Sequence, residues 1–180
     1  MTQARQFFLY LTVVTWGIII GGVVYSHIVY FPPFLSHLPE STSMLKGDYG
    51  IHEENFWMFI HPVAILSTLA ALMLNWKVTA RRKFILTPTV IYALAILATA
   101  TYFVPELIAF SESSDSTTVT AAEWLERGQT WQYLSWIRGS FMFAGFISLL
   151  IALTKANVIG QAQLKTKYEP ERARREQPVS

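Results

Sequence analysis

Four ionisable side chains interrupt otherwise apolar segments of this sequence: His27, His61, Glu106 and Arg138. Titratable groups are costly inside a membrane and tend to mark a functional interior. Counted at a helical rise of about 1.5 Å per residue, all four fall in the outer half of their segments. We therefore expect one catalytic layer, in which His27 and His61 act as acid and base and Arg138 stabilises negative charge on oxygen.

Metal binding is a second chemistry that these residues could perform. The candidate ligands are His27 and His61, together with Glu53 or Glu54, which directly precede the second apolar segment. Imidazole with carboxylate suits iron, copper or zinc, whereas two histidines on neighbouring helices could hold a b-type haem. Iron, copper and b-type haem are the cofactors left open. The aromatic side chains expected beside a cofactor are Trp57, Tyr102 and Trp136.

Two further interpretations need no metal. In one, Glu106 pairs with Arg138 inside a polar ligand pocket and a histidine transfers protons. In the other, the same pair only fixes the register of two helices, and both histidines are simply hydrogen-bonded. None of these spacings is a specific motif, so the argument rests on the convergence of polar residues from four segments.

Four apolar segments must position these residues: about 7–30, 55–76, 84–110 and 131–153. Each is long enough to cross a bilayer core of about 30 Å as a helix. Only 14% of the residues are charged, against about 25% in soluble domains, which excludes a typical water-soluble enzyme. We predict an all-α, four-transmembrane-helix antiparallel bundle over residues 1–160. Residues 161–180 form a polar tail, predicted to be disordered.

Basic residues and cysteines narrow the class further. Most of the 14 Lys and Arg residues precede the first segment, connect the second to the third, or follow the fourth. This bias predicts that both termini are cytoplasmic and that the protein lies in the cytoplasmic membrane. A net charge of +2 gives no indication of a nucleic-acid partner. The absence of cysteine excludes disulfides, iron–sulfur clusters and thiolate zinc sites.

The segments between and within the helices carry three more signals. Pro32 and Pro33 are expected to end the first helix and begin an outer loop over residues 31–54. A second outer loop is expected over residues 111–130. Gly17 and Gly21 form a G-x-x-x-G spacing, which is expected to allow close packing within the bundle.

Two stretches of sequence resemble a known family. Residues 21–35 read GGVVYSHIVYFPPFL, and residues 131–140 read WQYLSWIRGS. Small residues followed by proline in the first span, and a Trp-rich segment followed by arginine in the last, resemble the anthrone-oxygenase-like family of small four-helix membrane proteins. Some fungal relatives are assigned to the oxygenation of polycyclic anthrones to anthraquinones. The resemblance points to His27, Pro32, Trp136 and Arg138.

Together these patterns favour an integral membrane oxygenase-like or other redox enzyme. Its substrate would be a lipophilic aromatic or quinone-like molecule that enters from the bilayer and reaches the outer-half pocket. The alternative is a non-catalytic membrane subunit, a small-molecule binding or transport module, or a haem-binding membrane protein. Either form could act as a homo-oligomer or within a larger membrane complex.

Overall fold

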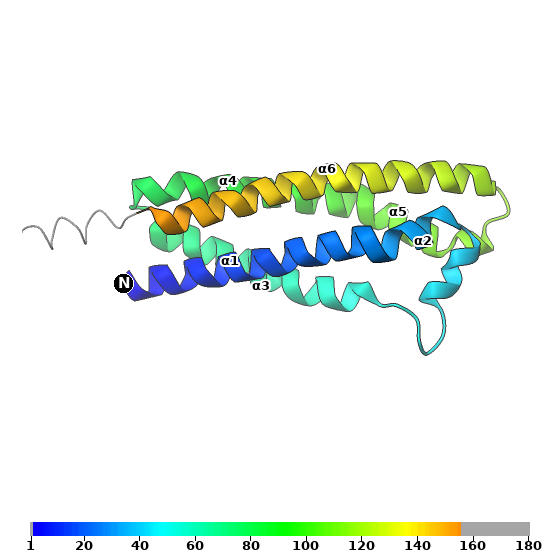
Figure 1. Ribbon diagram of the computed structural model, residues 1–180, viewed down its shortest axis with the longest axis horizontal. Coiled ribbons are helices and arrows are strands. Elements are labelled where there is room, and N and C mark those ends of the chain that lie inside the picture. The colour runs from blue at the N-terminus through cyan, green and yellow to red at the C-terminus, as the bar shows by residue number, and fades with distance from the viewer. Residues whose placement is uncertain (1, 156–180) are drawn as a thin grey trace, which may run out of the picture.

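The computed structural model describes residues 2–155, and their long helices lie side by side in an elongated bundle (Figure 1). This part of the chain contains no β-strand. Four helical stretches are long and apolar enough to cross a membrane: Gln3–Ser36, Glu53–Asn75, Thr79–Ser111 and Ala121–Thr154. The prediction of an all-α, four-span bundle is therefore confirmed. The tail predicted to be disordered lies outside the described residues.

Two of the four stretches are not uniform α-helices. The first consists of α1 (Thr2–Tyr25), the π-helical segment η1 (Ser26–Tyr30) and α2 (Phe31–Ser36). The third consists of α4 (Thr79–Ala98), the π-helical segment η3 (Thr99–Phe103) and α5 (Val104–Ser111). The second and fourth are the continuous helices α3 (Glu53–Asn75) and α6 (Ala121–Thr154). Two short 3-10 segments, η2 (Glu40–Leu45) and η4 (Ser113–Asp115), lie in the connections.

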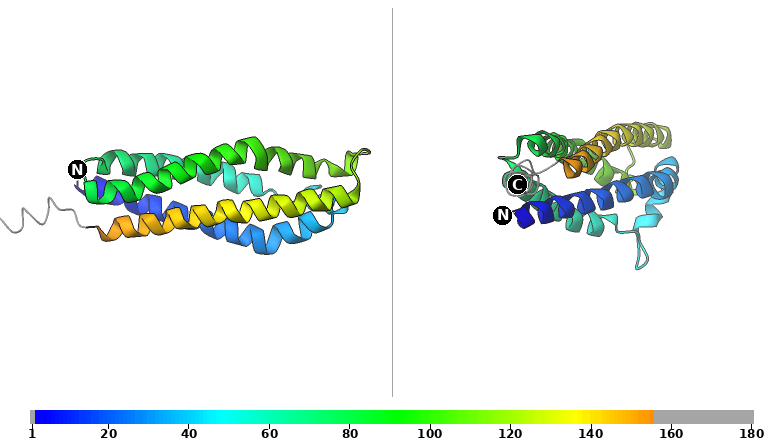
Figure 2. Two further views of the ribbon diagram at one scale, coloured as in Figure 1. Left: turned by 90° about the horizontal axis from the view of Figure 1, so that it is seen from above. Right: turned by 60° about the vertical axis from the view of Figure 1, so that its left-hand side comes forward.

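The helices form a closed ring in which each has two neighbours. α1 contacts α3 and α6, and α4 contacts the same two helices from the other side. Helices joined by short connections therefore run antiparallel, as in an up-down-up-down bundle. The N-terminus and the end of α6 lie together at one end (Figure 1), and we call the opposite end, which contains α2 and α5, the distal end. Figure 2 shows the same arrangement from above and from an oblique angle.

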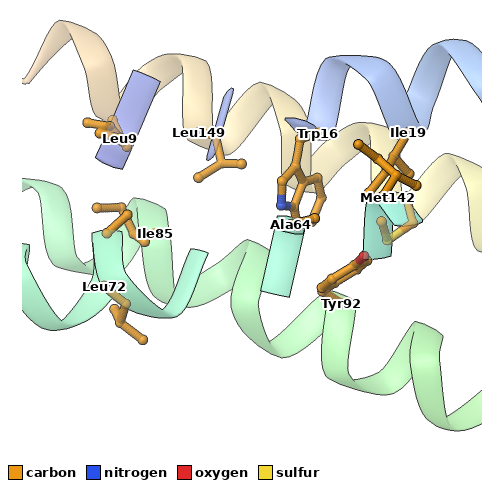
Figure 3. Packing of buried hydrophobic residues seen from close by; sticks show 12 residues of the cluster. Leu9, Trp16, Ile19, Ala64, Leu72, Ile85, Tyr92, Met142 and Leu149 are labelled. Atoms are coloured by element: carbon orange, nitrogen blue, oxygen red, sulfur yellow. The ribbon is translucent and has the colours of Figure 1, made fainter. Parts of the chain in front are cut away.

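Two apolar clusters hold the bundle together. The larger one, the central cluster, joins the four long helices and contains the fully buried Trp16 (Figure 3). The Trp16 indole N–H donates a 3.1 Å hydrogen bond to Thr68. The smaller one, the distal cluster, consists of Tyr30, Phe31, Phe34, Leu35, Leu38, Phe103, Phe110, Trp124 and Trp131. His27, Thr99 and Arg138 lie between these clusters along the chain, and we call the level of these residues the polar layer.

The two outer loops predicted over residues 31–54 and 111–130 are both shorter than expected. Pro32 and Pro33 do not end the first helix, which continues to Ser36. Proline is tolerated here because it lies in the first turn of α2. A backbone N–H at that position has no hydrogen-bond acceptor within α2, so its absence costs no bond there. The fourth helix begins at Ala121 rather than near residue 131. Its start is fixed by a capping box, in which the backbone N–H of Glu123 donates to the Thr120 hydroxyl and the Glu123 carboxylate accepts from the Thr120 backbone.

The two glycines of the G-x-x-x-G spacing, Gly17 and Gly21, do not lie at the same helix–helix contact. A Cβ atom added to Gly17 would lie 3.7 Å from Phe146 on α6, whereas one added to Gly21 would meet nothing within 4 Å. The close approach of α1 to α3 occurs instead at Gly22, where an added Cβ would lie 2.8 Å from Phe56. Close packing within the bundle is therefore present, but the neighbouring glycine provides it.

Candidate functional site: a polar layer between two cores

The two π-helical segments define the level of the site. η1 and η3 each contain five residues, and each is followed by a helix with proline at its second position, Pro32 in α2 and Pro105 in α5. π-Helical turns are rare and occur frequently at functional sites. Both segments lie where the central cluster gives way to the distal cluster. His27 lies in η1 of the first span and Thr99 lies in η3 of the third span, so both residues are at this junction.

His27 is a buried imidazole with one nitrogen bonded and one free of partners. It is 3% exposed, and its Nδ1 lies 2.7 Å from the carbonyl oxygen of Val23. Because a carbonyl only accepts hydrogen bonds, Nδ1 must carry the proton, and Nε2 is then the unprotonated nitrogen of the neutral ring. Nε2 is buried and has no hydrogen-bond partner. A buried acceptor without a partner is energetically costly, which is why it suggests a role in binding or catalysis.

Aromatic rings hold His27 in place. The Trp136 ring lies 4.6 Å from the imidazole, and the Phe31 ring lies 5.4 Å away in an edge contact. Trp136 is 39% exposed, so it reaches the surface of the bundle while His27 does not. Trp136 therefore covers the imidazole at the interface between the first and fourth spans.

Arg138 is the cation of the layer, and it is fixed by three contacts. Its guanidinium donates to the Thr99 hydroxyl at 2.7 Å and to the Ser135 hydroxyl at 3.0 Å. Its central carbon lies 3.9 Å from the centroid of the Phe103 ring, a cation–π distance. None of these partners carries a negative charge, and neither ion pair in residues 2–155 includes Arg138. An uncompensated positive charge in this layer favours an anion or a polar oxygen nearby.

His61 has a hydrogen-bond partner on a neighbouring helix. Its Nδ1 lies 2.6 Å from the hydroxyl of Tyr92, and its ring stacks on Trp57 at 5.6 Å. Trp57 in turn lies beside Gly22, at the contact between α1 and α3. His61 is thus tied to α4 through its Nδ1, whereas His27 is tied to the backbone of its own helix.

The predicted pair between Glu106 and Arg138 is wrong. Glu106 instead pairs with Arg127, whose guanidinium nitrogens lie 2.8–3.1 Å from both carboxylate oxygens. Arg127 also lies over the Trp124 ring at 4.5 Å. The reason is that α6 begins ten residues earlier than expected and presents Arg127 at the level of Glu106. Arg127 and Arg138 are about 16 Å apart along the helix, so one carboxylate cannot serve both.

The predicted metal ligands are held by other partners. Glu53 accepts a 2.6 Å hydrogen bond from Ser26, and the exposed Glu54 pairs with His52 at 2.8 Å. Within residues 2–155 no group of three or more His, Asp or Glu side chains is placed to hold a metal ion. The two histidines and the two glutamates therefore do not form the predicted metal site. Tyr102, predicted to line a cofactor site, packs against Phe103 and the distal cluster.

Sequence patterns did not identify three residues whose side chains bond to the predicted site residues. Thr99 and Ser26 are small hydroxyl residues, which are common in membrane helices where they bond to their own backbone, and Tyr92 is an aromatic residue in an apolar run. One sequence signal was available: a tyrosine–phenylalanine pair precedes proline in both discontinuous helices, at residues 30–32 and 102–105. The π-helical turns themselves leave no composition signature.

Comparison of the chain with protein-family models, with curated proteins and with solved structures gives no match.

Proposed function

We propose that the protein is an integral membrane enzyme that binds a lipophilic aromatic molecule carrying an acidic oxygen and promotes its oxidation. The observation that supports this most directly is the buried His27, whose Nε2 is oriented by the Val23 carbonyl to accept a proton and has no partner. A hydroxyl or an activated C–H group of a bound molecule is the donor that such a nitrogen lacks.

Arg138 supplies the second half of the proposed chemistry. When His27 removes a proton, negative charge develops on the oxygen of the bound molecule. A fixed guanidinium in a water-poor layer stabilises such charge without reorganisation. Thr99, Ser135 and Phe103 hold Arg138 in place, so its position does not depend on the ligand.

The resemblance to anthrone-oxygenase-like proteins suggests one substrate class. In an anthrone, loss of a proton from the ring methylene gives an electron-rich phenolate-type anion. Molecular oxygen can oxidise that anion: the methylene carbon loses both hydrogens, one oxygen atom becomes the new carbonyl, and the other leaves as water. His27 and Arg138 would act in the proton-transfer step, and O₂ is the oxidant.

The test is oxygen consumption by the protein in lipid nanodiscs with dithranol, a dihydroxyanthrone, as the probe. We expect wild type to consume O₂ and form the quinone faster than empty nanodiscs do. His27→Phe keeps the aromatic packing but removes the base, and should lower the rate about 100-fold or more. His37→Phe is the matched control, because His37 is exposed and lies outside the layer. A wild-type rate equal to that of empty nanodiscs would contradict this substrate class.

A non-catalytic binding module is the second candidate. It is favoured by the fact that His61 and Arg138 already have partners within the protein. In that case quinone-like molecules would bind, and His27→Phe would weaken binding, but no O₂ would be consumed above background. Binding without turnover, measured by quenching of tryptophan fluorescence, separates the two candidates.

A further inference from the structure

A lipid-facing groove lies between α1 and α3, toward the distal end of the bundle. Its volume is about 380 Å³, within the range of small-molecule sites. Its lining residues are Ile18, Gly21, Gly22, Tyr25, Ser26, Glu53 and Phe56. The groove is apolar over most of its length and carries a carboxylate at one end. The chemistry proposed above for His27 uses neither Glu53 nor the groove.

The two glycines give the groove its shape in different ways. Gly22 lets Phe56 and Trp57 approach the backbone of α1, since an added Cβ would lie only 2.8 Å from Phe56. Gly21 leaves the floor open, because an added Cβ would meet nothing within 4 Å. Tyr25 and Phe56 are 61% and 39% exposed and form the walls. From Ile18 to Ser26 the groove follows α1 for about 12 Å, a length suited to part of a hydrocarbon chain.

Glu53 gives the end of the groove a negative charge without a cation. The Ser26 hydroxyl donates to one carboxylate oxygen at 2.6 Å, and the Trp57 indole lies 3.5 Å from the other. In the described part of the chain the ion pairs are His52–Glu54 and Arg127–Glu106, and neither includes Glu53. A half-buried carboxylate with spare acceptor capacity favours a charged N–H donor.

We propose that this groove binds a membrane lipid whose headgroup carries a primary ammonium, with the ammonium on Glu53 and part of an acyl chain between α1 and α3. A primary ammonium offers three N–H donors, as in phosphatidylethanolamine. A choline headgroup carries the same charge but has no N–H to donate. Ser26 and Trp57 hold the carboxylate at this end of the groove.

Native mass spectrometry of the detergent-solubilised protein tests the headgroup. The probes are phosphatidylethanolamine and phosphatidylcholine with identical acyl chains. We expect phosphatidylethanolamine to be retained about tenfold more tightly, the difference that a charge-assisted hydrogen bond provides. Glu53→Gln should remove this preference, whereas Glu54→Gln should retain it, because Glu54 is exposed and pairs with His52. Equal retention of both lipids, or equal effects of the two substitutions, would overturn the assignment.

Filling the groove tests its location. Gly21→Phe places a ring where no atom lies within 4 Å of the Cβ position, so we expect the melting temperature to stay near that of wild type and retention of both lipids to fall. If Gly21→Phe lowers the melting temperature, the smaller Gly21→Leu takes its place. Unchanged lipid retention in the folded variant would contradict the proposal. His27→Phe should retain lipid as wild type does, which keeps this result separate from that of the proposed enzyme.

Discussion

At the scale of single residues, α6 carries two arginines with different tasks. Arg127 is one half of an ion pair with Glu106, and both carboxylate oxygens are engaged. Arg138 has hydroxyl and aromatic partners and keeps its charge available. The first arrangement is typical of a structural contact, while the second is typical of a group that meets a ligand.

Removing Arg127 should therefore destabilise the protein. The side chains of Arg127 and Glu106 are 37% and 23% exposed, so solvent screens the pair only in part. We expect Arg127→Met to lower the free energy of unfolding by about 1–3 kcal/mol. In a double-mutant cycle, Arg127→Met and Glu106→Gln should be strongly coupled, whereas Arg138→Met and Glu106→Gln should be additive. Chemical unfolding in detergent measures both, and coupling between Glu106 and Arg138 would contradict the observed pairing.

His27 should show the opposite balance of stability and function. His27→Phe removes the unpartnered Nε2 and keeps an aromatic ring against Trp136 and Phe31. Removing a buried polar atom without a partner should stabilise the fold, and the loss of the hydrogen bond to Val23 should offset part of that stabilisation. We expect the free energy of unfolding to change by less than about 1 kcal/mol, while ligand binding or turnover is lost. A large loss of stability would mean that His27 is a structural residue.

At the scale of helices, the two π-helical segments explain why the polar layer was predicted only in part. The four apolar runs were enough to predict the spans, whereas the roles of His27 and Arg138 stay a prediction. A π-helical turn holds an extra residue, which rotates everything after it by about 100° relative to a regular helix. Helical spacing therefore could not identify Thr99, in η3, as the partner of Arg138. Glu106 meets Arg127 for a different reason, because α6 begins earlier than expected.

The packing of α6 against α1 gives a prediction at the same scale. A Cβ atom added to Gly145 would lie 2.8 Å from the Trp16 ring, which is fully buried and hydrogen-bonded to Thr68. Because Trp16 cannot move aside, Gly145→Ala should lower the free energy of unfolding by about 1–3 kcal/mol. Gly21→Ala is the control in the same bundle: its Cβ meets no atom, and it should leave stability equal or higher. Thermal unfolding in one detergent compares the two.

At the scale of the whole molecule, the direction of insertion stays a prediction from the basic residues. The absence of cysteine makes it easy to test, because each introduced cysteine is the single labelling site. With the termini in the cytoplasm, Tyr49→Cys and Thr117→Cys should react with a membrane-impermeant maleimide on intact cells. Lys77→Cys should react only after permeabilisation. The reverse pattern would show that the distal end faces the cytoplasm.

The distal cluster closes one end of the polar layer with packed aromatic rings. Trp131 contacts both Phe31 and Phe103 there, between the layer and the distal connections. Water-soluble compounds arriving from that side would have to displace these aromatic rings. Hydrophobic compounds can instead reach the layer laterally, from the acyl-chain region of the bilayer. Occupancy would then follow the mole fraction of a compound dissolved in the bilayer, so potency should rank analogues by their partition coefficients rather than by their aqueous concentrations.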